Sequence, residues 1–135
     1  HPDHIGSVGE VLGAAAKATA YAGAADIPQI KSPRPMKAVG DNDEVFGLRV
    51  IATPGHTPGH VCVFDPAGSL LILGDAMNNN DKLSGPNPEY TADMVQAHQS
   101  VKKLAKLKFE RAVFGHGEPI NKGASQAIGK LAGTL

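Results

Sequence analysis

The sequence is poor in cysteine, aromatic residues and net charge, and each shortage excludes a class of protein. A single cysteine, Cys62, excludes an internal disulfide and favours a reducing compartment such as the cytoplasm. Tryptophan is absent and aromatic residues make up 4% of the chain, so Val, Ile, Leu and Ala must build the core. Lysine plus arginine and aspartate plus glutamate number 13 each, so the chain lacks the basic excess of a nucleic-acid binder.

Long apolar runs are also missing. No stretch approaches the ~20 apolar residues that cross a bilayer, so no membrane partner is expected. The 135 residues suffice for one domain, taken here as residues 1–135, because domains usually contain ~100–150 residues. The 16 glycines and 10 prolines predict a protein rich in loops.

Short apolar runs alternate with helical patterns. Strands are predicted at 17–21, 45–46, 48–52, 61–64, 69–73 and 111–114. The runs Val61–Phe64 and Leu70–Leu73 lack polar alternation, which favours strands buried on both faces. Helices are predicted at 7–16, 22–30, 91–107 and 121–135. Their expected caps are a Ser7–Glu10 capping box, Thr91 and Asn121. This alternation predicts an α/β layered fold.

Four of the six histidines stand in Gly/Pro-rich loops or beside a carboxylate, close to predicted strand ends. A rigid sheet can direct such loop side chains at one point, and imidazole and carboxylate together suit Zn²⁺, with Fe or Mn as alternatives. Asp75 follows the strand ending at Leu73, and its two oxygens would allow it to bridge two ions. The candidate metal ligands are His1, Asp3, His4, His56, Asp75 and His116.

These motifs resemble those of the metallo-β-lactamase superfamily, in particular its compact glyoxalase-II-like metallo-hydrolases. His1-Pro2-Asp3-His4 is similar to the end of the family's His-x-His-x-Asp-His motif. His56 in Thr-Pro-Gly-His-Thr, Asp75 in Gly-Asp and His116 in Gly-His match the later motifs in order. The resemblance implies an αββα sandwich of which this chain covers roughly the C-terminal two-thirds, without the N-terminal part. The family's first motif has one more histidine, two positions before His1.

The resemblance also implies roles for these residues. His1 and His56 would bind a first zinc ion, Asp3, His4 and His116 a second, and Asp75 would bridge the two. A metal-bridging hydroxide would attack the carbonyl carbon of an ester, thioester, lactone or amide in a small molecule. Asp3 would also serve as a catalytic residue that orients the nucleophile or shuttles its proton. Lactones and thioesters are the nearest substrate guesses, and glutathione thioesters are less expected because no helical domain follows His116.

Two other functions stay open. Persulfide dioxygenases of this superfamily keep the same motifs but use one iron held by two histidines and an aspartate. A non-catalytic metal-binding fragment is the third alternative. Metal content discriminates the three, because two zinc ions favour hydrolysis and one iron favours oxygen chemistry.

A half-exposed sheet edge would also favour a homo-oligomer.

The remaining polar residues carry weaker signals. Tyr90 and Asn78, in the loop after Asp75, are candidate substrate contacts, although helix-entry packing is the preferred interpretation of Tyr90. His60 is expected to pack behind the site, His98 to be structural or exposed, and Cys62 to be an inert buried thiol. A basic cluster is interpreted as a solvated helix face: Lys102, Lys103, Lys106, Lys108 and Arg111.

Overall fold

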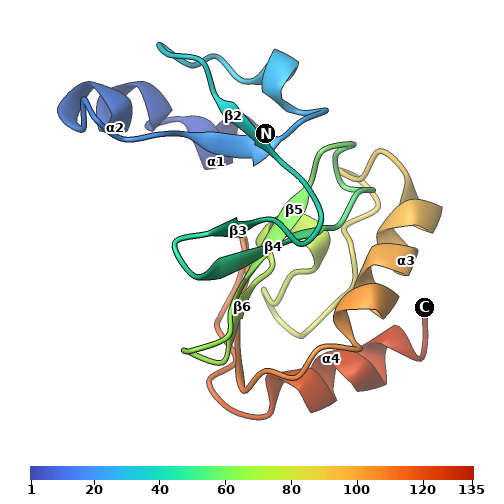
Figure 1. The fold of residues 1–135 in the computed structure, drawn as a ribbon. Helices are drawn as coiled ribbons and strands as arrows, with labels where there is room; N and C mark the ends of the chain where they lie inside the picture. Colours follow the sequence, from blue (N-terminus) through green and yellow to red (C-terminus); the bar gives the residue numbers. More distant parts are fainter.

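A five-stranded sheet forms the larger part of the structure, a computed structural model that describes all of His1–Leu135 (Figure 1). Its strands are β3 (Glu44–Val45), β4 (Leu48–Ala52), β5 (Val61–Asp65), β6 (Leu70–Ile72) and β7 (Arg111–Val113), and they lie side by side in that order. Neighbouring strands are antiparallel except β6 and β7, which are parallel. The five strands lie close to the predicted ranges. This topology sends the carboxyl ends of β4, β6 and β7 to one edge of the sheet.

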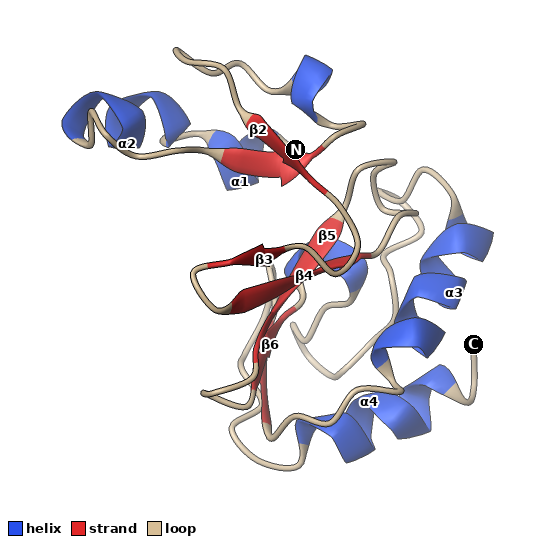
Figure 2. Ribbon diagram, viewed as in Figure 1, coloured by secondary structure: helices blue, strands red, loops and turns tan.

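Two helices, α3 (Met94–Leu104) and α4 (Ala124–Ala132), cover one face of the sheet (Figure 2). Strand residues that point to this face, such as Cys62 and Leu71, pack in one cluster with Val101 of α3 and Ile128 of α4. Each of these four side chains is at most 1% exposed. Ala97 and Leu104 lie at helical spacing from Val101 and are buried with it. No helix in the structure has the length and apolar character needed to cross a membrane.

The opposite face of the sheet is only partly covered. Val63 pairs with Ile72 and Ile72 with Val113, so the three side chains share this face, where Ile72 is 39% exposed. The prediction that these strands are buried on both faces is therefore wrong within this chain. An apolar run signals that a strand can be buried, but packing partners decide whether both faces are covered.

A smaller N-terminal unit lies beyond the ligand-bearing edge of the sheet (Figure 1). It contains α1 (Pro2–Ile5), α2 (Val8–Ala14), the parallel strands β1 (Tyr21–Gly23) and β2 (Lys37–Val39), and a 3₁₀ turn at Ile27–Gln29. The predicted helix at 22–30 is wrong, because pairing with β2 takes 21–23 into a strand. The predicted strand at 17–21 begins only at Tyr21, and neither α1 nor β2 was predicted.

Two predicted helix caps are wrong, and a third, Ser7, is confirmed in position only. Asp93, not Thr91, caps α3, since its carboxylate accepts the Gln96 backbone N–H at 2.9 Å. Helix α4 begins after Gly123, whose φ of 69° ends the preceding turn, rather than at Asn121. Ser7 stands before α2, but its hydroxyl makes no capping hydrogen bond. The presence of these helices could be predicted from the sequence, whereas their first residues depended on local backbone geometry.

Candidate metal centre

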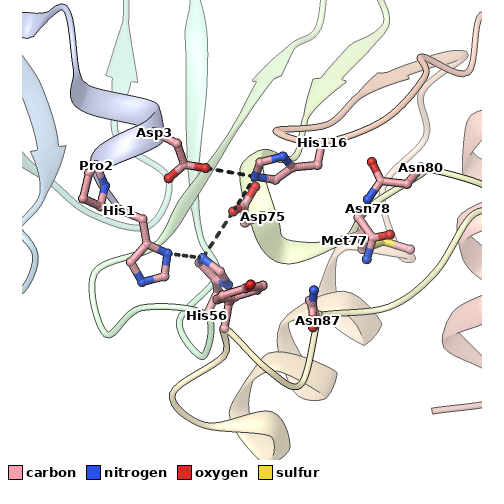
Figure 3. A pocket seen from close by; sticks show the side chains of 11 residues that line it. His1, Pro2, Asp3, His56, Asp75, Met77, Asn78, Asn80, Asn87 and His116 are labelled. Atoms are coloured by element: carbon pink, nitrogen blue, oxygen red, sulfur yellow. Dashed lines mark hydrogen bonds and ion pairs between the residues drawn. The ribbon is translucent and has the colours of Figure 1, made fainter.

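The four sequence motifs converge at the edge of the sheet where β4, β6 and β7 end. The loop after β4 supplies His56, the 3₁₀ turn Gly74–Ala76 after β6 supplies Asp75, and the loop after β7 supplies His116. The N-terminal unit adds His1, Asp3 and His4 from the start of α1. Figure 3 shows five of these side chains pointing toward one another. Side chains that are as far as 115 residues apart in the chain thus form one cluster.

One oxygen of Asp75 lies at the centre of this cluster. Its Oδ2 is 3.1 Å from His4 Nε2, 3.3 Å from His56 Nε2 and 3.5 Å from His116 Nε2. His4 belongs to the N-terminal unit, whereas His56 and His116 belong to loops of the large sheet. A single carboxylate therefore contacts imidazoles from both parts of the structure. This is the position that a bridging ligand would need.

The six side chains divide into two groups of three that could each hold an ion. One consists of His1, His56 and Asp75, and the other of Asp3, His4 and His116. In the first, His1 Nδ1 lies 3.0 Å from His56 Nε2, and in the second Asp3 Oδ2 lies 3.2 Å from His116 Nε2. Ligand atoms of a tetrahedral zinc at ~2.0–2.1 Å stand roughly 3.3 Å apart, so the spacing fits a metal.

A second observation supports this fit. Asp75 Oδ1 is buried and has no hydrogen-bond partner, although an unpaired buried carboxylate oxygen is costly. A cation would satisfy it. The backbone also leaves this oxygen room, because a Cβ at Gly115 would lie 2.1 Å from Asp75 Oδ1 and 2.7 Å from His4 Cε1.

The surroundings adjust the charge of the ligands. His56 is 5% exposed, and burial lowers the pKa of its imidazole below the usual value, so the ring is neutral and can donate a lone pair at neutral pH. Burial acts to raise the pKa of Asp3, but a backbone hydrogen bond and the nearby His4 and His116 outweigh it, and the pKa is lowered. Asp3 is therefore ionised as a metal ligand must be.

A polar cavity of about 540 Å³ opens beside the two groups. Its wall includes both predicted substrate contacts, Tyr90 and Asn78. Asn80, Asn87 and Met77 line it beside Asn78 (Figure 3). Tyr90 is 59% exposed, so the preferred interpretation of it as a helix-entry packing residue is wrong. Asn78 faces the cavity but also donates from Nδ2 to the Gly85 carbonyl at 3.0 Å, which shapes the loop. Asn87 and Met77 were missed, because nothing in their local sequence distinguishes them.

Thr91 and Asp26 also act at the site, and neither role was predicted. Thr91 Oγ1 lies 3.4 Å from His56 Nδ1, so the residue expected to cap a helix contacts a candidate ligand instead. The Asp26 carboxylate accepts hydrogen bonds from the Thr57 hydroxyl and, at 2.8 Å, from the Gly59 backbone N–H. It thereby fastens the loop that carries His56 to the N-terminal unit. Such contacts join residues more than 30 positions apart, beyond the reach of local patterns.

The other polar predictions have clear outcomes. His60 packs behind the site as expected, and its Nε2 accepts the Asp75 backbone N–H at 3.2 Å. His98 is half-buried on α3, and Cys62 is a free thiol that is buried as predicted. Of the basic cluster, Lys102, Lys106, Lys108 and Arg111 are exposed, but the last three lie after α3, so the predicted helix face is wrong. Lys103 is the exception, since its ammonium contacts Asp41 and the Ala52 carbonyl.

Comparison with known proteins agrees with the motifs and the geometry. The family model described as metallo-beta-lactamase superfamily matches residues 1–116, which include all six candidate ligands. The chain belongs to the metallo-β-lactamase superfamily. Its metallo-β-lactamase fold was therefore predicted correctly from the motifs, and its relatives in the superfamily include named hydrolases.

Among these relatives is a hydroxyacylglutathione hydrolase of Ectopseudomonas mendocina, 35% identical over 79% of this chain and 40% of that protein. An N-acyl homoserine lactonase of Bacillus thuringiensis is 34% identical over 57% of this chain and 33% of its own length. The chain thus spans well under half of either relative. The solved structure of TTHA1623 in a di-iron-bound form has 30% identity and a TM-score of 0.75, covering 88% of this chain and 67% of that one.

Proposed function

We propose that this superfamily domain is a two-metal hydrolase that cleaves an uncharged ester, thioester or lactone of a small molecule. The central position of Asp75 Oδ2 between imidazoles of both groups carries the proposal, because it joins two three-ligand clusters into one centre. Zinc is the first choice, since histidine and carboxylate ligands in sets of three leave a coordination position open for water or substrate. Iron is the alternative, because the relative TTHA1623 has a di-iron form.

Different residues of the chain would bind the metal ions, take up a proton and orient the substrate. His1, His56 and Asp75 would hold one ion, and Asp3, His4 and His116 the other. When bound, such ions lower the pKa of water toward ~7 and polarise a carbonyl. The exposed Asp3 carboxylate stands at the cavity wall, where Oδ2 could take up a proton during hydrolysis. Amides of Asn80 and Asn87 would orient polar groups of the substrate.

The composition of the cavity wall favours an uncharged substrate. Its 11 lining residues include neither lysine nor arginine, so the wall offers no such side chain to pair with a substrate carboxylate. Three asparagine side chains line it instead, and amides match neutral amide or ester groups. Lactones such as those cleaved by the relative from Bacillus thuringiensis suit this wall better than glutathione thioesters with their two carboxylates.

Metal counting combined with a substrate screen tests the proposal. We expect about two zinc ions per chain and faster hydrolysis of a neutral lactone than of a glutathione thioester. His116→Ala removes a half-exposed ligand, so it should retain the fold, lose one ion and lower the hydrolysis rate by at least about 100-fold.

His98→Ala is the matched control, because this histidine lies on α3 away from the cavity and its replacement should change neither quantity. Two ions retained in His116→Ala would refute the ligand assignment. One iron in the unmodified protein would favour the dioxygenase, and a chain without metal would indicate a non-catalytic fragment.

A further inference from the structure

Beneath the turn that carries Asp75, three side chains form an unbroken line of hydrogen bonds. Thr53 follows β4, His60 precedes β5 and Cys62 belongs to β5. Thr53 and Cys62 are each 1% exposed, and His60 is half-buried between them and the turn. None of the three belongs to the candidate ligands. Two of them nevertheless form hydrogen bonds with the backbone of Leu73 and Asp75, the residues on either side of Gly74.

The first end of the line determines the proton position on His60. A backbone N–H can only donate, and the Asp75 N–H points at His60 Nε2 at 3.2 Å. Nε2 therefore carries the lone pair, and the single proton of the neutral ring must be on Nδ1. That proton is donated to Thr53 Oγ1, which lies 2.8 Å away.

The other end determines the remaining hydrogens. The Leu73 carbonyl can only accept, and Cys62 Sγ donates to it at 3.3 Å. The thiol has one hydrogen, so its sulfur must accept from the Thr53 hydroxyl, 3.2 Å away. Burial raises the pKa of Cys62 to about 12, which keeps the thiol protonated. Each hydrogen atom in the line can therefore occupy only one position, and all four hydrogen bonds form at the same time.

The line begins on Asp75 and ends on Leu73, so it holds the turn at both neighbours of Gly74. Gly74 has a φ of 52°, and a Cβ there would lie 2.9 Å from His60 Nε2. From the opposite side, the Gly74 carbonyl accepts the Gly115 N–H at 2.8 Å. The turn is therefore clamped between β5 and the loop after β7, with little freedom to shift.

We propose that Thr53, His60 and Cys62 are positioning residues that fix the turn carrying Asp75, with His60 held as the Nδ1–H tautomer. The role rests on the proposed function, in which Asp75 bridges two ions. By holding this backbone, the line keeps Asp75 Oδ2 within 3.5 Å of the three imidazoles around it. Partners behind a ligand typically change metal affinity ~10–100-fold when removed.

The tautomer is tested on the unmodified, metal-free chain. Long-range ¹H–¹⁵N correlation spectra at pH 7 should show His60 with a protonated Nδ1 and an unprotonated Nε2, and His60→Gln identifies its signals. A protonated Nε2 overturns the proposal. This measurement needs neither metal nor substrate, so its failure is distinct from a failure of the proposed hydrolase, which would leave the tautomer unchanged.

A pair of substitutions tests the positioning role. Thr53→Val keeps the shape but removes the hydroxyl, and we expect zinc to bind roughly 10-fold more weakly or worse in titration calorimetry. Thr53→Ser keeps the hydroxyl and should bind zinc within about 2-fold of the unmodified chain, provided that the hydrogen bond is what matters.

Ser125→Ala is the stability control, because it removes a hydrogen bond to the Phe109 backbone far from Asp75. It should lower the unfolding temperature without weakening zinc binding. Equal zinc affinity in Thr53→Val and the unmodified chain overturns the proposal, as does an equal loss of affinity in Ser125→Ala.

Discussion

At the scale of single residues, Gly115 shows how closely the backbone is fitted to the candidate ligands. A methyl group at this position would overlap Asp75 Oδ1 and press on His4 Cε1, at 2.1 Å and 2.7 Å. Its backbone also donates to the Gly74 carbonyl, so the residue cannot move away without releasing the turn that carries Asp75. The glycine of this Gly-His motif is therefore required by space rather than by an unusual φ.

Gly115→Ala should displace the Asp75 carboxylate and weaken zinc binding by roughly 10-fold or more, with hydrolysis reduced in parallel. Titration calorimetry measures the first effect and a lactone assay the second. Gly129→Ala is the matched control, since its Cβ would meet nothing within 4 Å in the middle of α4. That change should stabilise the fold by about 0.5–1 kcal/mol and leave zinc affinity unchanged. Unweakened zinc binding in Gly115→Ala would contradict the packing argument.

At the scale of elements, an ion pair joins the turn between β2 and β3 to helix α3. The Lys103 ammonium lies 2.5 Å from Asp41 Oδ1 and 2.8 Å from the Ala52 carbonyl, and Asp41 Oδ1 accepts the Ala52 N–H at 2.9 Å. Three segments thereby meet at one carboxylate. The hydrogen bond from Lys103 lowers the pKa of Asp41 below the usual 3.8.

This lowered pKa gives a pH dependence with a defined sign. The unfolded chain binds a proton at Asp41 more readily than the folded chain, so the stabilisation is complete above pH 3.8 and is lost as pH falls through the folded value. Both side chains are about two-fifths exposed, so the contribution is at most about 1 kcal/mol. Urea unfolding should show Asp41→Asn to be less stable at pH 6, with the difference shrinking toward pH 2.5.

Lys103→Met is the matched change on the other partner and should reduce the same pH dependence. Lys102→Met serves as a control, since Lys102 is exposed and is not part of this ion pair. A stability difference between Asp41→Asn and the unmodified chain that is constant from pH 2.5 to 6 would contradict the assignment.

At the scale of the whole molecule, the candidate metal centre lies between two parts of the structure. Helix α1 buries none of its own residues, yet it carries His1, Asp3 and His4 to ligands from the sheet edge. The firm contacts between the two parts are Asp26 with the loop of Thr57 and Gly59, and the close approach of Gly23 to Gly59. Ions held by residues of both parts would add further links.

Zinc should therefore protect α1 as well as the sheet edge. We expect zinc at 100 times its dissociation constant to stabilise the fold by ~2.7 kcal/mol and to slow hydrogen exchange at 2–14. His4→Ala should lose most of the protection at 2–14 while keeping that of β4 and β6. Protection confined to the sheet in the unmodified chain would show that α1 supplies no ligand.

Elements that depend on local sequence patterns were predicted well, and elements that depend on contacts between distant residues were predicted poorly. The strands of the large sheet and the helix α3 were predicted because apolar runs and the Ala97–Val101–Leu104 stripe are local signals. The N-terminal unit was predicted poorly, since Ala-rich residues 22–25 favour a helix in isolation. There, pairing of β1 with β2 and the packing of Gly23 on Gly59 override propensity.

The sequence alone determined the superfamily and the candidate ligands, because those residues stand in short motifs whose order and spacing are local properties. Only the tertiary structure decided that Asp75 Oδ2 faces three imidazoles, that Asp26 and Thr91 support His56, and that Thr53 and Cys62 hold the turn of Asp75. These relations join strand ends through space, and a hydrogen bond between distant residues leaves no periodic trace along the chain.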